Sequence, residues 1–459
     1  MAKRVTFIFL MRSPNRRVAK PARPLQRFKR KTIAMTVSAD IFQRHDGELW
    51  MENVALSAVA ERFGTPCYVY SRAAIESVWT RYDRAFGTRR HRVHYAVKAN
   101  GNLAVLDTLA RLGSGFDIVS GGELARVMAA GGAPAKVVFS GVGKSAAEMR
   151  AALAADIGVF NLESASEMER LNSIAGECGQ RARIAIRVNP DVDAKTHPYI
   201  STGLNENKFG VPMTEALALY RRAAALPNLR ITGVACHIGS QLTDLAPFAD
   251  AMARVMALVD ELAAAGIEIE HVDAGGGLGI RYRDEVPPAI EDYVAVLCRA
   301  IPEPYEICIE PGRSICGTAG VLLSRVEYLK ETPTRRFAIC DAAMTELIRP
   351  ALYEAWHEVQ TVGTEAAAEP ELTYDLVGPV CESADFLASG RALRLREDSL
   401  LAIMSAGAYG QAMASNYNAR PRPPEVMVDG STMHLARPRE EILELYASER
   451  VLPGHSEGA

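Results

Sequence analysis

The stretch "HRVHYAVKAN", residues 91–100, combines a strand pattern with a charged end. Val93, Tyr95 and Val97 alternate along it as they would in a β-strand, and the apolar run then stops at Lys98. Buried strands seldom end on a cation, because an unpaired charge away from water is costly. Lys98 is therefore a candidate functional residue. The plainer alternative is a lysine whose stem packs on the protein while its amine reaches solvent.

The same pattern recurs along the chain, and amphipathic helical segments separate the repeats. Repeated strand–helix units predict a parallel sheet. Eight units favour an α/β fold with a closed (β/α)8 TIM-like barrel over an open doubly wound sheet. The eight predicted strands are Val93–Lys98, Phe116–Ser120, Val137–Gly141, Gly158–Glu163, Ile184–Asn189, Ile231–Gly239, Ile269–Gly276 and Glu306–Gly312.

After about residue 320 the pattern changes to short alternating runs separated by turn residues, which predicts a C-terminal antiparallel β domain. A short segment before the barrel, around residues 47–70, is expected to supply an edge element to that domain. The predicted organisation is a disordered basic extension over 1–38, a segment joining the β domain over 39–68, the barrel over 69–319 and the β domain over 320–459.

Charge is unevenly distributed along the 459 residues. Of the 52 Lys and Arg, eleven precede Asp40, whereas all 55 Asp and Glu lie at Asp40 or beyond. The net charge of −3 disfavours a nucleic-acid binder, and no run approaches the roughly 20 apolar residues of a membrane span. The eight cysteines form no CxxC pair, so neither a disulfide framework nor a metal site is expected, and the cytoplasm is the expected compartment.

Polar residues gather where the predicted strands end, and the active sites of such barrels lie at the carboxyl ends of the strands. Each residue alone has an ordinary structural explanation: His237 as a core histidine, the glycines as a tight turn and Cys381 as a small buried hydrophobe. Together they predict one site. The strand-end residues are Lys98; Asp117, Ser120 and Glu123; Arg187 and Asn189; His237 and Ser240; the "DAGGGLG" run, 273–279; and Glu310 and Arg313.

Two glycine-containing motifs do not fit the nucleotide-binding patterns that they resemble. "GGGLG" is followed by Ile280 where the dinucleotide fingerprint has Gly or Ala. "GVGKS", residues 141–145, lacks the first glycine of a phosphate-binding P-loop, because that position is Val138. We therefore do not expect a nucleotide site.

The combination of groups at the strand ends describes a different cofactor. A glycine-rich loop near a Ser hydroxyl suits a phosphate, and a lysine in a partly desolvated cavity can form a Schiff base. A glutamate can keep a ring nitrogen protonated, and a histidine can stack on a flat ring. These are the requirements of pyridoxal 5'-phosphate.

Ten motifs that occur in order resemble those of the diaminopimelate decarboxylases, pyridoxal-phosphate enzymes of the alanine-racemase-like barrel family. The resemblance runs from about Gly47 to Pro453, and Ala384 replaces a common glycine. The motifs are "YAVKAN", "FDIVSGGEL", "RVNPDVD", "STGLNENKFG", "CHIGSQ", "DAGGGLGI", "EPGR", "LIRPALY", "GPVCESADFLA" and "GAYG".

The resemblance implies a role for each matching residue. Lys98 is similar to the lysine that attaches the cofactor, His237 to the histidine stacked on its ring, and Glu310 to the partner of the ring nitrogen. Cys381 resembles the proton donor, and Glu382 the residue facing the distal amine; both are expected to reach the site of a partner subunit. The remaining cofactor residues are Asp117, Ser240, Gly275, Gly276, Gly277, Arg313 and Tyr409, and the substrate residues are Arg313, Arg349, Tyr353, Glu382 and Tyr409.

The implied activity is decarboxylation of meso-2,6-diaminopimelate to L-lysine and CO2, the last step of lysine biosynthesis, in a homodimer. A decarboxylase of another basic amino acid, of the ornithine/lysine or carboxynorspermidine type, is the same-fold alternative. An amino-acid racemase would need a second acid/base, for which Cys381 is the only candidate. A non-enzymatic pyridoxal-phosphate carrier would lack the C-terminal β domain.

The basic extension offers a first prediction. Residues 1–34 carry no pattern of a folded core, and Met35 is a candidate alternative start. Deleting residues 1–34 is expected to leave turnover unchanged, measured against the full chain under the same conditions. An inactive truncation would show that the segment has a structural role.

Overall fold

The computed structural model describes residues 41–192 and 208–452. The expected basic extension lies outside the described residues, as does most of the "STGLNENKFG" motif. None of the described helices combines the length and apolarity that a membrane span requires.

A closed barrel of eight parallel strands forms the first part of the fold, as predicted. Strand β9 pairs with both β8 and β11, which closes the ring, and the two-residue β10 (Val211–Pro212) adds to β9 from outside it. The barrel strands are β5 (His91–Ala96), β6 (Gly115–Ile118), β7 (Val137–Phe139), β8 (Val159–Leu162), β9 (Ala182–Asn189), β11 (Leu229–Cys236), β12 (His271–Asp273) and β13 (Glu306–Ile309).

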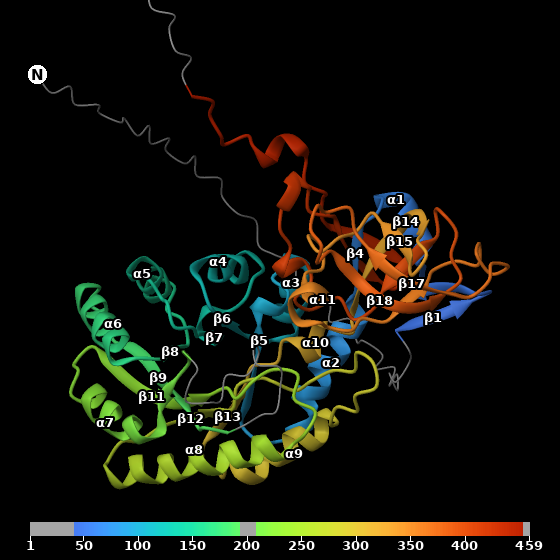
Figure 1. Cartoon of the computed structure of the whole chain (residues 1–459). Coiled ribbons are helices and arrows are strands. Elements are labelled where there is room, and N and C mark those ends of the chain that lie inside the picture. Colours follow the sequence, from blue (N-terminus) through green and yellow to red (C-terminus); the bar gives the residue numbers. More distant parts are fainter. Residues whose placement is uncertain (1–40, 193–207, 453–459) are drawn as a thin grey trace, which may run out of the picture. The chain divides into compact units, whose positions relative to one another are not determined.

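Helices surround these strands (Figure 1). Side-chain caps fix where several of them begin: Asn102 caps α3, Ser120 caps α4 and Ser164 caps α6, and Ser145 forms a capping box with Glu148 on α5. The helices are α2 (Arg72–Ala85), α3 (Leu103–Leu112), α4 (Gly121–Ala129), α5 (Ala146–Ala154), α6 (Ala165–Glu177), α7 (Met213–Ala224), α8 (Ala246–Ala264), α9 (Ile290–Ala300) and the short α10 (Arg313–Cys316).

Seven of the eight barrel strands end earlier than predicted, and β9 ends where expected, at Asn189. β5 stops at Ala96, and the chain enters a 3₁₀ turn at Val97–Ala99, so Lys98 lies just after the strand. β12 has only three residues, and Gly275, two residues beyond it, adopts a positive φ of 69° that a ladder residue does not adopt.

The second part of the fold is a mostly antiparallel sheet, as predicted, but two of its pairings are parallel: β15 with β17 and β20 with β4. The short α11 (Arg349–Tyr353) follows β15. The strands are β4 (Cys67–Ser71), β14 (Gly320–Glu331), β15 (Arg336–Cys340), β16 (Val359–Thr361), β17 (Leu372–Val377), β18 (Phe386–Leu393), β19 (Leu400–Ile403), β20 (Glu425–Asp429) and β21 (Thr432–Arg437).

The early segment contributes an interior strand, which corrects the predicted edge position. β4 lies between β14 and β20, and all five of its residues are buried, which an edge strand would not require. A boundary between residues 68 and 69 would cut β4 in two. Ser71, the last residue of β4, caps α2, where the barrel part begins. The preceding elements are β1 (Phe42–His45), β2 (Glu48–Met51), β3 (Val54–Ala55) and α1 (Leu56–Phe63).

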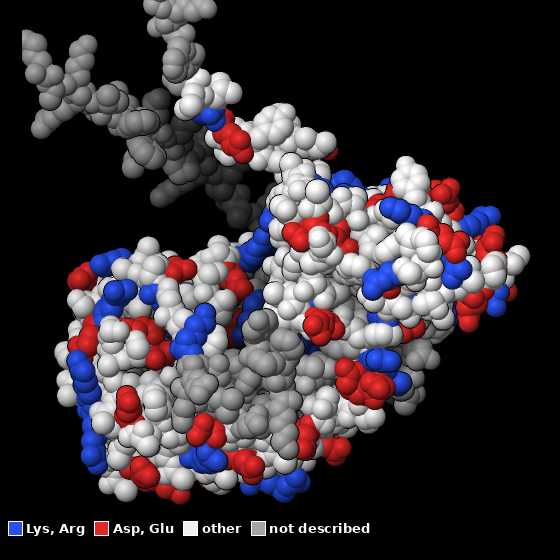
Figure 2. Space-filling model, in the orientation of Figure 1, with Lys and Arg blue, Asp and Glu red and all other residues white. Residues whose placement is uncertain are grey.

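Hydrogen bonds join the β domain to the turn that carries Lys98. The Tyr409 N–H donates to the Ala99 carbonyl at 2.8 Å, and the Asn100 side-chain amide donates to the Gly407 carbonyl at 3.1 Å. The β domain therefore helps to hold the candidate cofactor lysine in place. On the face shown in Figure 2, acidic and basic side chains are interspersed rather than separated by sign.

A buried histidine lies at the opposite, N-terminal end of the barrel. His94 on β5 is 3% exposed, and its Nδ1 has no hydrogen-bond partner among the described residues. Burial, with smaller contributions from the charges of Arg92, His271 and Lys136, lowers the pKa of His94 to about 3. The folded protein therefore holds this imidazole neutral.

Acid should destabilise the fold through His94. The unfolded chain has the ordinary histidine pKa and binds a proton below about pH 6.5, whereas the folded state resists protonation until about pH 3. The contribution of His94 to stability is therefore fully present above pH 6.5. Its loss lowers the free energy of unfolding by on the order of 3 kcal/mol at pH 4. Urea denaturation at pH 7 and pH 4 checks this, and His94→Gln should show a correspondingly smaller pH-dependent loss. An equal loss in the variant would contradict the assignment.

Candidate active site

Lys98 lies at the mouth of the barrel beside a buried carboxylate. Its Nζ donates to Asp117 Oδ2 at 3.1 Å, and Asp117 is 1% exposed. Burial lowers the pKa of Lys98, but the charges of Asp117, Tyr409 and Glu310 outweigh that effect, so the pKa is raised above its ordinary value. The acidic groups around Lys98 therefore favour the charged form of its amine.

Three carboxyl groups form a cluster near Lys98: Asp117 and Glu310 act on its charge, and Asp273 interacts with both of them. Burial, together with the charges of the two aspartates, raises the pKa of Glu310 well above its ordinary value, and burial raises that of Asp273 to about 6. Glu310 Oε1 and Asp117 Oδ1 have no hydrogen-bond partner among the described residues. Buried polar atoms are nearly always bonded, so this cluster is suited to a cationic or hydrogen-bond-donating ligand.

His237 and the glycine run form the neighbouring wall. The Gly276 N–H donates to His237 Nδ1 at 3.2 Å, which places the imidazole proton on Nε2. Burial, with the charges of Arg187 and Lys98, lowers the pKa of His237 well below its ordinary value. The ring is therefore neutral and can pack against a flat ligand.

The three glycines are required by close backbone approach. A Cβ on Gly275 would lie 2.4 Å from the Cys236 carbonyl oxygen, and one on Gly276 would lie 2.2 Å from that of Glu310. Gly277, at a φ of 122°, would place a Cβ 2.6 Å from the Gly239 carbonyl oxygen. No side chain fits at these positions, so the backbone of this run packs directly against the ends of the neighbouring strands.

Two buried arginines lie on the side of the site nearer the β domain. Arg313 is 7% exposed and donates to Ser240 Oγ at 3.1 and 3.3 Å and to the Tyr282 hydroxyl at 2.8 Å. Arg349 is 6% exposed and donates to His357 Nε2 at 2.8 Å. Neither guanidinium forms an ion pair with a carboxylate of the described residues. Unpaired buried charge is costly, so this pair is suited to an anionic ligand group.

One cavity of about 470 Å³ brings together Lys98, His237, Glu310 and the two arginines. Asp117 and the three glycines are not among its lining residues, whereas residues from the ends of β7, β9 and α5 are. Such a volume suits a cofactor and a small substrate. It is lined by Lys98, Val119, Ser140, Gly141, Val142, Gly143, Glu148, Arg187, Phe209, His237, Ser240, Glu310, Arg313, Arg349, Tyr353 and Tyr409.

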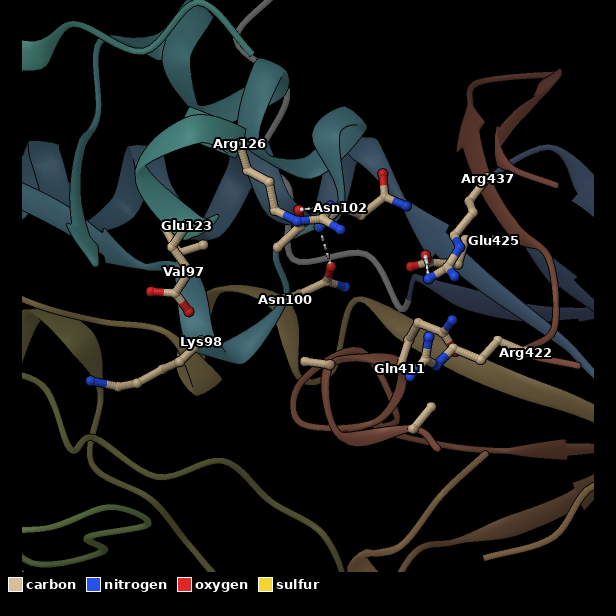
Figure 3. Close-up of a pocket in the computed structure, with 13 residues that line it drawn as sticks. Val97, Lys98, Asn100, Asn102, Glu123, Arg126, Gln411, Arg422, Glu425 and Arg437 are labelled. Atoms are coloured by element: carbon tan, nitrogen blue, oxygen red, sulfur yellow. Dashed lines mark hydrogen bonds and ion pairs between the residues drawn. The ribbon is translucent and has the colours of Figure 1, made fainter. Parts of the chain in front are cut away.

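A second cavity, of about 360 Å³, lies on the other side of the Lys98 turn (Figure 3). Arg126, Arg422, Glu425 and Arg437 line it, and the Lys98 amine points away from them. Arg422 and Arg437 both form ion pairs with Glu440, which lowers the cost of burying their charges. This cavity is therefore separate from the groups that face Lys98 Nζ.

Cys381 and Glu382 are not among the residues lining the 470 Å³ cavity. Both are exposed, and the Cys381 N–H donates to Asn418 Oδ1 at 2.9 Å. Within one chain the structure does not bring them to Lys98. This arrangement is compatible with the prediction that both residues contribute to the active site of a second subunit.

Tyr282 and His357, which contact the two arginines, were not identified from the sequence. Both lie in loops, whereas the strand-end pattern identifies residues at the ends of predicted strands.

Two residues that were named from the sequence form ion pairs within the fold. Arg187 pairs with Glu163 at 3.2 Å. Lys144 of "GVGKS" donates to two backbone carbonyls and to Glu167 at 2.6–2.8 Å. These three hydrogen bonds occupy the three donors of the Lys144 amine. The amine is therefore not available for a phosphate, in agreement with the conclusion that this motif is not a P-loop.

Comparison with known proteins adds to this geometry. Residues 72–317 match the family described as "Pyridoxal-dependent decarboxylase, pyridoxal binding domain". The diaminopimelate decarboxylase of Pseudomonas aeruginosa is 59% identical over 415 residues, which cover 90% of this chain and 100% of the relative. The chain belongs to the diaminopimelate decarboxylase family.

Solved structures of this family agree with the architecture. A Helicobacter pylori diaminopimelate decarboxylase complexed with L-lysine is 41% identical, with a TM-score of 0.83 over 86% of this chain and 99% of that one. A Vibrio vulnificus lysine/ornithine decarboxylase complexed with putrescine is 24% identical, with a TM-score of 0.72 over 82% and 97%. This last likeness extends to the fold alone. The barrel and β domain of the chain are therefore those of its family.

Proposed function

We propose that this protein decarboxylates meso-2,6-diaminopimelate to L-lysine and CO2 and that it uses pyridoxal 5'-phosphate. The observation that carries the proposal is the pair of buried guanidiniums, Arg313 and Arg349, that no carboxylate of the described residues neutralises. A substrate with a second carboxylate supplies the missing anion, and arginine binds a carboxylate through two parallel hydrogen bonds. The family relationship supports the same conclusion.

The residues present fit the cofactor. The unpartnered Oε1 of buried Glu310 suits a protonated ring nitrogen, and the glycine run with Ser240 suits a phosphate. Lys98 is the amine available for covalent attachment, and His237 supplies a neutral ring face. When bound, the cofactor supplies an electron sink for the bond broken at the α-carbon.

The remaining chemistry belongs to the side chains. Arg313, Arg349 and Tyr353 orient the substrate from its far end, and Asp117 holds the Lys98 amine within the cavity. Cys381 of a second subunit donates the proton that replaces CO2, and Glu382 faces the distal amine. The proposal therefore includes a homodimer with shared sites. It also places the enzyme in the cytoplasm, where its eight free cysteines stay reduced.

A substrate panel tests the activity. The purified protein with added cofactor should release CO2 from meso-diaminopimelate and much less from L-lysine or ornithine. These two amino acids have a single carboxylate, so Arg313 and Arg349 would stay unpaired when that carboxylate is placed for decarboxylation. Comparable kcat/KM for ornithine would favour the basic-amino-acid decarboxylase alternative. No release from any of the three would overturn the proposal.

A further inference from the structure

We propose that His357 and Tyr282 position the two substrate arginines and thereby set the preference for a substrate with a distal carboxylate. The inference rests on the proposed function and deepens it. Neither residue lines the 470 Å³ cavity, although Tyr282 lines a neighbouring cavity of about 290 Å³ with the two arginines. Both residues contact Arg313 or Arg349 directly and act through them. They are positioning residues rather than catalytic ones.

The hydrogen bonds of His357 determine its protonation. Its Nδ1 lies 2.8 Å from the Met404 carbonyl oxygen, which can only accept, so Nδ1 carries the proton. Its Nε2 is then a free lone pair and accepts from Arg349 Nη1 at 2.8 Å. The side chain is 0% exposed, and burial followed by the charge of Arg349 lowers the pKa of His357 to about 3. The imidazole therefore remains an acceptor throughout the neutral range.

The backbone around His357 is also held. The Arg391 Nη2 donates to the His357 carbonyl at 3.0 Å, and Arg391 is 7% exposed. The Met404 carbonyl belongs to the segment that follows β19. His357 thus links Arg349 to the backbone of the β-domain sheet.

Tyr282 connects the two arginines to each other. Its hydroxyl accepts from Arg313 Nη1 at 2.8 Å, and its ring face lies 4.5 Å from the Arg349 guanidinium carbon. The same ring meets the His357 ring edge-on at 5.3 Å. One side chain therefore uses its polar end for one cation and its π face for the other.

The segment carrying Tyr282 is fixed by side-chain hydrogen bonds. Glu285 Oε2 accepts from the backbone N–H of Tyr282 at 3.0 Å and of Arg283 at 2.8 Å. Gln241 bonds both the N–H and the carbonyl of Ile280. These hydrogen bonds hold the backbone of Tyr282 in place in the absence of substrate.

Holding Arg313 and Arg349 in position before substrate binds is important, because the two guanidiniums repel each other. The charge of Arg313 contributes, after burial, to lowering the pKa of Arg349. Without neutral acceptors and a ring between them, the side chains would turn toward water, and substrate binding would have to reorder them. Groups already held at the bound geometry avoid that ordering cost, which raises affinity only for a ligand that uses both.

Two conservative variants of His357 distinguish the loss of its hydrogen bond to Arg349 from a general loss of packing. In His357→Asn the side-chain amide can still donate to the Met404 carbonyl, but no acceptor reaches Arg349. In His357→Gln the amide oxygen takes the place of Nε2 and can accept from Arg349. His357→Asn is expected to raise KM for meso-diaminopimelate about tenfold, the effect of losing one hydrogen bond to a charged group. Its kcat should change less than about threefold, and His357→Gln should restore KM to near the wild-type value.

A second readout uses a ligand that cannot reach the arginines with a carboxylate. Inhibition by cadaverine, a diamine with no carboxylate, should have the same Ki in wild type and His357→Asn, whereas the Ki for L-lysine should rise, because the product keeps the carboxylate at the end that is not decarboxylated. A general distortion of the site would change both constants. Tyr282→Phe removes only the hydroxyl and should raise KM several-fold, whereas Tyr293→Phe is the matched control, because that buried hydroxyl has no partner among the described residues.

The outcomes distinguish the two proposals. A wild-type protein that does not decarboxylate diaminopimelate overturns the proposed function and this inference with it. With an active wild type, equal KM in His357→Asn and wild type overturns the inference alone, as does an equal rise in the Asn and Gln variants. If His357→Asn does not fold, the comparison of Tyr282→Phe with Tyr293→Phe decides: equal KM values overturn the inference.

Discussion

Replacing Lys98 by alanine is expected to reduce CO2 release from meso-diaminopimelate at least about 10³-fold, because the amine directed at the carboxyl cluster is removed. The visible absorbance band that the bound cofactor owes to its covalent link with this lysine should disappear at the same time. Absorbance spectra and a CO2 assay on the same sample measure both effects.

The control for this variant is Lys136→Ala. Lys136 is exposed at the far end of the barrel, where its amine donates to the Gly113 carbonyl at 2.8 Å. Its loss should change neither the spectrum nor the rate by more than about twofold. A Lys98→Ala protein that keeps the band and its turnover would show that another residue attaches the cofactor.

Replacing Cys381 by alanine is expected to slow turnover about 10²–10⁴-fold, the usual contribution of a positioned proton donor. The cofactor band should remain, because Cys381 is not among the residues that line the cavity around Lys98. Steady-state kcat and the absorbance spectrum test the two parts separately. The matched control is Cys178→Ala, an exposed cysteine at the end of α6, which should leave kcat unchanged.

Mixing the two inactive variants tests whether Cys381 acts across a subunit interface. A heterodimer of Lys98→Ala and Cys381→Ala subunits carries both changes in one site and neither in the other. A randomly exchanged equimolar mixture should regain about one quarter of wild-type activity, because half of its dimers are heterodimers and each has one intact site. No recovery after verified subunit exchange would mean that Cys381 acts within its own chain or not at all.

Much of the barrel could be predicted from local pattern. Alternating residues such as Val93 and Tyr95, and caps such as Ser120 and Ser145, are read from neighbouring positions. The polar strand ends also predicted the shared cavity of Lys98, His237 and Glu310, because parallel strands direct their carboxyl ends to one face.

The β domain was less predictable, because its pairings join distant segments. β4 was expected at an edge and lies inside the sheet, since its five buried residues need a neighbour on each side. The two parallel pairings have no local signature, because alternation predicts a strand but not its partner. The pKa of Lys98 also depends on distant segments, because Asp117, Glu310 and Tyr409, which raise it, come from three other parts of the chain.

The order of the residues alone was enough to establish a barrel, a lysine at its mouth and a family of pyridoxal-phosphate enzymes, because periodicity and short motifs are properties of adjacent positions. Only the folded chain could place Tyr282 between Arg313 and Arg349, turn the lone pair of His357 toward a guanidinium, and leave Cys381 outside its own cavity. The contacts of Tyr282 with Arg313 and Arg349, for example, join residues 31 and 67 positions apart. Packing of the β domain against the barrel decides them, and no local pattern records it.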